Sequence, residues 1–395
     1  MSWPEVDFET LYVTPSRNGV YKSKDHHGSG VPVVNMGELF GFDRIGDQPM
    51  SLIRMSEAEM EKSGLVNGDL LFGRRSLVEE GAGKCSMVFN STGPLTFESS
   101  IIRVRLDNLV ADPEFYFNYF RSPVGRSRIR AIVGGAAVKG IRGSDLKLIK
   151  VHLPLISEQI AIRQVIAAYD DLIATNQRRI ALLEQAARLL YREWFVHLRF
   201  PGHELVPVVE GVPRGWTRGP LEQALFLQRG FDLPNGDRSP GDVPVYGSTG
   251  INGHHDAAKA TGPGVVTGRS GTLGVVHYVP QDYWPLNTAL WVKEFRAVSP
   301  LVAYFMLSEL KLGALNSGAS VPTLDRKVAH QMPVLIPASK VVADFDARVQ
   351  PLFDQIHTLK AKNSAAAKAR DLLLPKLMSG QLDVSRIPLP EEART

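Results

Sequence analysis

The sequence predicts an α+β fold, with two mixed α/β domains separated by two long helices that form an antiparallel coiled coil. Two coiled-coil seams and one ordered internal repeat, which implies a pseudo-two-fold relation between the halves, lead to this prediction. The composition, 44% hydrophobic and 22% charged over 395 residues, is that of a globular chain with room for two or three domains. We expect a first mixed domain, a first long helix, a second mixed domain, a second long helix and a tail at residues 1–156, 157–199, 200–337, 338–380 and 381–395.

Both long helices are predicted from residues that alternate in steps of three and four. The first seam contains Ile162, Ile166, Tyr169, Ile173, Asn176, Ile180, Leu183, Ala187, Leu190 and Trp194. The second contains Val342, Phe345, Val349, Leu352, Ile356, Leu359, Asn363, Ala366, Arg370, Leu373 and Leu377. About 40 residues at about 1.5 Å each make a helix of about 60 Å.

An antiparallel pairing with Asn176 opposite Asn363 gives every other residue of the first seam a partner in the second. Trp194 then lies opposite Phe345. Because a lone buried amide is costly and a paired one fixes the register, we assign the two Asn residues to register. The alternative is that each helix packs on its own domain. Pro351 lies inside the second seam, so we expect a kink or a helix start near residue 350.

Residues 1–156 are predicted to form short strands and turns interrupted by one helix that begins at Pro113. Residues 200–337 repeat the order of these segments. The matched segments are GVPVVNMG (30–37) with DVPVYGST (242–249), DLLFGRR (69–75) with GVVTGRS (264–270), SSIIRV (99–104) with NTALWV (287–292), PEFYFNYF (113–120) with PLVAYFML (300–307), and GGAAV (134–138) with SGASV (317–321). The chain is therefore interpreted as a tandem duplication of a mixed domain followed by a long helix.

The remaining composition limits the class of protein. A single cysteine, Cys85, excludes an internal disulfide framework and indicates a reducing compartment. No secretory signal and no run of 18 apolar residues is present, so we expect a cytoplasmic protein without a membrane partner. The net charge of +4 and the pI near 9.0 permit an anionic partner without requiring one.

No catalytic or metal-binding motif is found in the sequence. The Asp/Asn-Pro-Pro-aromatic motif of enzymes that methylate base amino groups is missing. GAGKC (81–85) resembles a phosphate-binding loop, but Cys85 stands where Ser or Thr is needed. The pairs His26–His27 and His254–His255 lack further ligands at metal-binding spacing and are interpreted as surface loops. We therefore expect no catalytic site, no metal and no cofactor in this chain.

Duplex DNA is the partner that a duplicated chain with two separated modules suits best, because modules one helical turn apart meet the same face of the duplex. Residues 120–150 contain eight basic residues and one acid, a net +7, and Gly residues between them favour a loop that follows phosphates. The alternative for this stretch is a solvated helix end followed by a charged strand. The matching stretch of the second domain is poorer in charge, so binding by the first domain should depend more on salt.

An Arg-bearing turn occurs in both copies, Arg74–Arg75 in the first and Arg269 in the second. Arg can read guanine in the major groove, and Ser or Thr can contact phosphate or base edges; an Arg at a strand end also commonly pairs with an acid. Our candidate DNA contacts are Arg74, Arg75, Lys84, Arg126, Arg128, Arg130, Lys139, Arg142, Arg269, Ser270, Thr272, Ser320, Thr323 and Arg326.

Taken together, these segments resemble the DNA-specificity subunits of type I restriction-modification systems. The resemblance rests on DDLIATNQRRIALLEQAARLLYREWF (170–195), ARDLLLPKLMSGQLDV (369–384) and the paired segments GDLLFGRR, TGRSGTLGVV, PLNTALWV and GASVPTL. The family usually ends each recognition domain with Pro followed by a Glu-Gln pair. The first copy keeps this as PLISEQ, whereas the second has PASKVVADF.

The resemblance implies that each mixed domain is a target-recognition domain for one half of a split DNA target, with the helix pair setting the gap. It also implies that two methyltransferase subunits dock on the helices and bring S-adenosylmethionine, and that restriction subunits join this core. The chain itself would be non-catalytic. Two alternatives are a coiled-coil scaffold that never touches nucleic acid, and an enzyme with an unrecognised site between a domain and the helices.

Overall fold

A computed structural model describes residues 3–318, 320–384 and 387. The chain forms two compact units. The first comprises the residues up to Thr175 together with those from Asn363 onward, and the second comprises Asn176–Lys362. Each unit therefore contains one mixed domain and a segment of both long helices.

The main sheet of the first unit has five strands in the order β2-β10-β6-β8-β4. Apolar runs at the predicted positions supply its buried centre. The strands are β2 Tyr12–Asn18, β4 Arg44–Ile45, β6 Leu70–Gly73, β8 Cys85–Val88 and β10 Ile101–Leu106. All pair antiparallel except β4 with β8.

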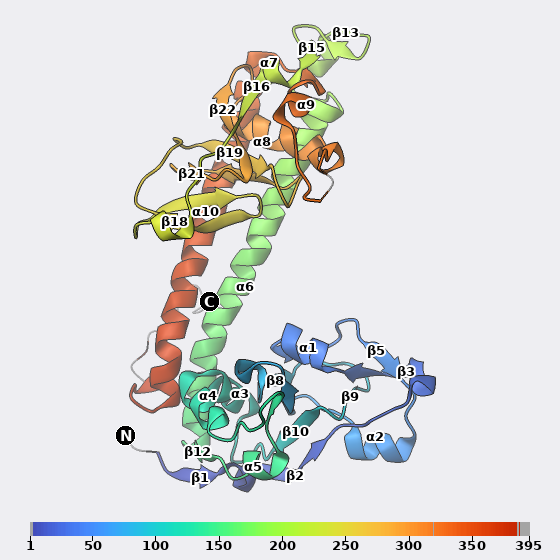
Figure 1. The fold of residues 1–395 in the computed structure, drawn as a ribbon, viewed down its shortest axis with the longest axis vertical. Coiled ribbons are helices and arrows are strands. Elements are labelled where there is room, and N and C mark those ends of the chain that lie inside the picture. The colour runs from blue at the N-terminus through green and yellow to red at the C-terminus, as the bar shows by residue number, and fades with distance from the viewer. Residues whose placement is uncertain (1–2, 319, 385–386, 388–395) are drawn as a thin grey trace. The chain divides into compact units, whose positions relative to one another are not determined.

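A smaller lobe of the first unit contains a three-stranded sheet of order β5-β3-β9, and an apolar cluster packs this lobe against the main sheet. It lies farther from the helices than α3 and α4 do (Figure 1). The lobe contains β3 His27–Val34, β5 Ser51–Ile53, β9 Thr96–Phe97, α1 Met36–Gly41 and α2 Glu57–Ser63. The other elements of this unit are β1 Glu5–Asp7 paired with β12 Lys150–His152, β7 Arg75–Ser76 paired with β11 Lys139–Gly140, α3 Pro113–Arg121, α4 Pro123–Arg130 and α5 Gly143–Leu146.

The second unit is built to the same plan. Its main sheet has the order β16-β22-β19-β20 and its smaller sheet the order β18-β17-β21. The strands are β16 Leu225–Arg229, β17 Val243–Gly247, β18 Gly250–His255, β19 Gly264–Gly268, β20 Val276–Val279, β21 Trp284–Pro285 and β22 Ala289–Phe295. The other elements are β13 Val208–Val209, β14 Val212–Pro213, β15 Thr217–Pro220 paired with β23 Pro333–Ile336, α7 Leu221–Ala224, α8 Pro300–Glu309 and α9 Arg326–His330.

The strand pairing follows the predicted internal repeat. In both units the strand from the third matched segment, β10 or β22, lies between an edge strand and the strand that carries the Gly-Arg turn, β6 or β19. In both small sheets the central strand pairs antiparallel with one neighbour and parallel with the other. The single helix predicted in the first domain is α3, but α1, α2, α4 and α5 were not predicted.

The two predicted long helices are α6 Ile156–Tyr191 and α10 Ser339–Met378. A π-helical turn, Arg192–Val196, follows α6. Short 3-10 turns occur at Phe8–Leu11, Lys24–His26, Glu79–Gly81, His203–Leu205, Asn235–Asp237 and Leu312–Leu315.

The helices pack together antiparallel in each unit. In the first unit, Ile162 and Ile166 share an apolar cluster with Leu377. In the second unit, the rings of Trp194 and Phe345, a predicted pair, lie 5.8 Å apart edge to face. This confirms the antiparallel pairing. The pairing of Asn176 with Asn363 stays a prediction, because the two residues belong to different units.

Of the two outcomes expected near residue 350, the helix start is wrong, because α10 runs unbroken from Ser339 past Pro351, and the kink stays a prediction. Pro351 has no N–H, so the carbonyl of Ala347 lacks its usual helical donor. Both residues are exposed. Water can therefore satisfy that carbonyl, and the helix continues.

Candidate nucleic-acid interface

The Arg-bearing turn of the first copy is held on both sides by main-chain hydrogen bonds. The N–H of Arg74 donates to the carbonyl of Ser100 at 2.8 Å. The carbonyl of Arg74 accepts the N–H of Ile141 at 3.1 Å. Arg75 then pairs through β7 with Gly140 of β11. The turn is thus joined to the glycine-rich loop of the basic stretch at residues 120–150.

An open cavity of about 550 Å³ lies where the Arg turn meets the glycine-rich loop. Four predicted DNA contacts from two distant stretches line it, Arg74, Arg75, Lys139 and Arg142, together with half-buried Asp145. Within the described part of the chain, none of the four basic side chains makes an ion pair or hydrogen bond. Four unengaged cations around one hollow are suited to an anionic polymer.

The glycine-rich loop has this shape because a glycine lies at its turn. Gly135 has a φ of +99°, and a Cβ there would lie 2.2 Å from the carbonyl oxygen of Val138. Only glycine adopts this conformation without strain at such a close approach. The loop therefore presents Lys139 beside the Arg turn.

The other basic residues of the 120–150 stretch are mostly engaged locally. The guanidinium of Arg126 donates to the carbonyls of Gly83 at 3.0 Å and Glu80 at 2.8 Å, and burial lowers its pKa. Acids from elsewhere in the first unit bind most of the others. These ion pairs are Arg128 with Glu5, Arg121 with Asp43, Lys147 with Glu9 and Lys150 with Asp7.

Lys84 is engaged as well. Its ammonium donates to the carbonyl of Phe40 at 2.7 Å and lies 3.6 Å from Asp43. Arg130, in contrast, is exposed on α4, and the described residues give its side chain no partner. The run of basic residues therefore does not form one continuous phosphate-tracking surface.

In the second copy the Arg turn is built in the same way. The N–H of Arg269 donates to the carbonyl of Thr288 at 2.9 Å, and its own carbonyl accepts the N–H of Leu324 at 2.8 Å. Ser270 pairs with Thr323 in an antiparallel bridge. The guanidinium of Arg269 donates to the carbonyl of Asn287 at 3.3 Å.

The remaining candidates of the second copy lie near this turn or next to it in sequence. Thr272 and Ser320 are exposed. The hydroxyl of Thr323 donates to the carbonyl of Val321 at 3.0 Å. Arg326 is exposed at the start of α9, with its guanidinium carbon 5.9 Å from the Phe226 ring centroid. This copy is mainly polar where the first copy is cationic.

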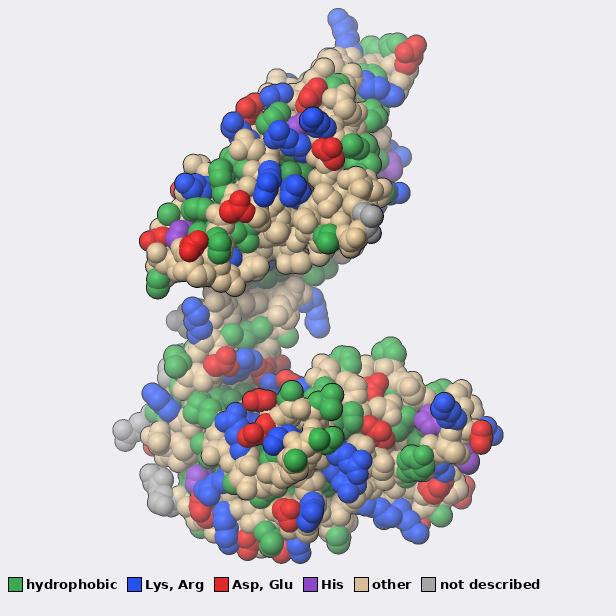
Figure 2. All heavy atoms as spheres, viewed as in Figure 1, with side chains coloured by type: hydrophobic (Ala, Val, Ile, Leu, Met, Phe, Trp, Pro, Cys, Tyr) green, Lys and Arg blue, Asp and Glu red, His purple; other side chains and the backbone are tan. Residues whose placement is uncertain are grey.

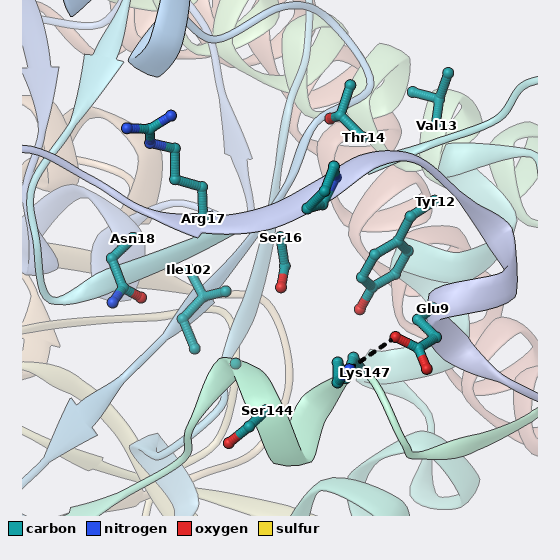
Figure 3. A pocket seen from close by; sticks show the side chains of 12 residues that line it. Glu9, Tyr12, Val13, Thr14, Ser16, Arg17, Asn18, Ile102, Ser144 and Lys147 are labelled. Carbon is teal, nitrogen blue, oxygen red and sulfur yellow. Dashed lines mark ion pairs between the residues drawn. The ribbon is translucent and has the colours of Figure 1, made fainter.

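Sequence reasoning missed a second hollow of the first unit, a groove of about 610 Å³ between the edge strand β2 and α5. Ser16, Asn18 and Ser144 line it, and the Glu9–Lys147 ion pair of 3.1 Å lies at one end (Figure 3). Arg17 leaves the opposite side of β2 from Ser16 (Figure 3). The polar run TPSRN at 14–18 was the available signal, but only the pairing of β2 at a sheet edge gives it significance.

On the face seen in Figure 2, Lys and Arg side chains alternate with Asp and Glu over each unit. The described residues include no cluster of three or more His, Cys, Asp or Glu side chains able to hold a metal. His255, expected in a surface loop, is instead buried on β18, where its Nδ1 accepts the N–H of Ser239.

Cys85 is fully buried on β8, and burial raises its pKa, which makes the thiol unreactive. In the described part of the chain, no helix is both long and apolar enough to cross a bilayer.

Two copies of one mixed domain, each with an Arg turn held by the same main-chain bonds, define a duplicated protein with two long helices. Comparison with known proteins gives one matching family model and several similar proteins. The family model "Type I restriction modification DNA specificity domain" matches residues 15–185. The MjaIX specificity subunit of Methanocaldococcus jannaschii is 22% identical over 93% of this chain and 90% of its own length. The EcoKI specificity subunit of Escherichia coli is 30% identical over 43% of this chain and 37% of its own length.

The fold has a counterpart in a crystal structure of the type I restriction-modification S subunit from M. genitalium. The TM-score is 0.60 at 16% identity, covering 95% of this chain and 96% of that one. Together these comparisons support this chain as a type I restriction-modification specificity subunit. It is a non-catalytic, DNA-binding subunit that carries no cofactor itself and that assembles with other subunits.

Proposed function

We propose that each mixed domain recognises one half of a bipartite duplex DNA target. The observation that carries this proposal is the Arg turn built twice on the same pattern of main-chain bonds, at Arg74 and at Arg269. A module made twice in one chain suits a target with two half-sites. The different side chains around the two turns suit half-sites of different sequence.

In this proposal the long helices set the spacing between the two half-sites. Both α6 and α10 run from one unit into the other, so their length sets the gap between the half-sites. Packing of the two helices against one another within each unit supports this role.

The outer face of the helix pair is the proposed docking site for the methyltransferase subunits. In the second unit, Leu182, Leu183 and Leu359 line an open groove of about 550 Å³, with Arg179 and Asp354 among its polar lining residues. Leu182 is 59% exposed, although it lies on a helix that packs on both a domain and another helix. An exposed apolar strip of this kind marks a protein interface. Two methyltransferase subunits would bring S-adenosylmethionine, and restriction subunits would join this core.

Mapping methylated sites tests the proposal. The chain is combined with its methyltransferase subunit and S-adenosylmethionine, and the modified positions are read from a random DNA library. We expect a motif of two short sequences separated by a constant gap, and no methyl transfer by this chain alone. A contiguous motif, or transfer by the chain without a partner, would contradict the proposal.

A further inference from the structure

The two Arg turns can be compared position by position, because the same main-chain bonds define both. Arg74 corresponds to Arg269, since each donates to the strand alongside and accepts from the loop before the next short helix. Arg75 corresponds to Ser270, since these residues bridge to Gly140 and Thr323. Gly135 corresponds to Gly318, where a Cβ would lie 2.0 Å from the carbonyl oxygen of Val321.

The side chains at these positions fall into two groups. The Arg at the first turn position is the same in both copies. The positions around it differ, namely Arg75 against Ser270, Lys139 against Pro322, Gly140 against Thr323, and Arg142 against Asp325. The backbone frame is thus kept while most of the surrounding chemistry is changed.

We propose that Arg74 and Arg269 contact DNA phosphates in both half-sites, and that the differing positions, led by Arg75 and Ser270, read the bases. This inference rests on the proposed function. The phosphate backbone is the same in any two half-sites, whereas the base edges differ. A side chain that is the same in both domains is therefore best explained by a contact with phosphate. The positions that differ between domains are then those that can distinguish sequences.

The chemistry of the differing positions indicates what each domain reads. In the first copy, Arg75, Lys139 and Arg142 offer only donors, which match the O6 and N7 acceptors of guanine. In the second copy, Ser270 and Thr323 carry hydroxyls that both donate and accept, and Pro322 carries neither charge nor donor. We therefore assign a guanine-containing half-site to the first domain and a half-site less dependent on guanine to the second.

The shared Arg is placed for a phosphate contact. Arg269 is half-buried, and one guanidinium N–H donates to the carbonyl of Asn287, which anchors the side chain. The guanidinium has five N–H donors, so others are left for a phosphate. Arg74 is half-buried at the rim of the 550 Å³ cavity, and its guanidinium has no partner among the described residues. The main chains of Arg74 and Arg269 are each hydrogen-bonded to two neighbouring segments, so each Arg would meet a phosphate at a fixed position in its domain.

Two variants of the full chain, assembled with the methyltransferase subunit, separate the two roles. Arg74→Ala should weaken binding to cognate and unrelated duplexes by a similar factor, roughly tenfold, and should reduce the slope of log affinity against log salt by about 0.9. Its methylation motif should stay unchanged. Arg75→Ser should change the preferred base at one position of the first half-site, by roughly 5- to 150-fold in affinity, and leave the second half-site unchanged.

Lys62→Ala, which removes an exposed charge on α2 of the same unit, is the matched control and should leave the motif and the salt slope as in wild type. Circular dichroism of each variant confirms folding before binding is measured. A changed motif in Arg74→Ala, or an unchanged one in Arg75→Ser, overturns the inference while the wild-type bipartite motif still supports the proposed function. Absence of that wild-type motif overturns both.

Discussion

In the first unit, the side-chain amide of Asn363 on α10 donates a hydrogen bond of 3.2 Å to the main-chain carbonyl of Ile173 on α6. Ile173 lies one helical turn before Asn176, which is itself fully buried. The Asn of the second seam thus bonds the facing helix at the level where the sequence places the register contact. Near this level, Arg370 and Asp170 form an ion pair of 2.6 Å between the same helices.

A double-mutant cycle tests the register role of the two Asn residues. Asn363→Leu should lower the free energy of unfolding by roughly 1–3 kcal/mol, because a polar contact in the seam is lost. Replacing Asn176 and Asn363 together should cost much less than the sum of the single changes if the amides interact. Denaturant unfolding measures all three variants. Additive losses would mean that Asn363 acts through the Ile173 carbonyl alone.

Lengthening both helices tests their role in spacing. Four residues inserted after Leu183 and four after Gln355 add about 6 Å, close to two base pairs of duplex. We expect the gap in the methylation motif to grow by about two base pairs with both halves unchanged. The same insertion at Gly236, which lies in an exposed turn, is the control. A constant gap in the helix variant would refute the spacing role.

Arg126 and Lys139 should behave oppositely, although both lie in the same basic stretch. Arg126→Ala removes hydrogen bonds to the carbonyls of the 80–83 turn, so it should destabilise the protein by roughly 1–3 kcal/mol. Lys139→Ala should leave the melting temperature unchanged and weaken binding to DNA that carries the cognate first half-site. Thermal melting and DNA titration of both variants check this. Equal effects on stability would contradict the assignment.

Leu182→Glu tests the docking groove on the helix pair. A charge in the apolar groove should weaken binding of the methyltransferase subunit by roughly tenfold or more, because the partner would have to desolvate it. Affinity is measured by calorimetry with the purified partner. Leu205→Glu is the control, since Leu205 is 87% exposed and lies outside the groove. Identical affinities for the two variants would place the docking site elsewhere.

His330 should make the second unit sensitive to acid. Its Nε2 accepts the N–H of Leu227 at 2.9 Å, and burial lowers its pKa below 6.5, with Glu222 opposing the shift and Arg326 and Arg296 adding to it. The unfolded chain therefore takes up the proton first, so stability is complete above about pH 6.5 and falls as the pH drops below that value.

His330→Gln keeps an acceptor and removes the titration. Melting temperatures between about pH 7.5 and 5.5 should fall less in this variant than in wild type. Equal slopes for both proteins would show that the Leu227 contact does not control the acid response.

Several elements missed from the sequence had a local signal. Helices α1 and α2 both begin with a capping box, Asn35 with Glu38 and Ser56 with Glu59. Both helices are short, however, so their apolar period is not visible over a window long enough to distinguish a helix from a turn. The burial of His255 had no such signal, because it depends on the packing of β18.

Sequence motifs carried the family resemblance, and the sequence by itself determined the two long helices, their antiparallel pairing and the duplication of the mixed domain. These follow from heptad spacing and from repeated segments, which are properties of the chain read in order. Only the tertiary structure decided which basic residues remain available to DNA. The acids that engage Arg128, Lys147 and Lys150 lie in residues 5–9, more than 120 positions away, and the turn at Arg74 meets Lys139 only through the pairing of β7 with β11. Charge partners brought together by folding cannot be read from charge counts along the chain.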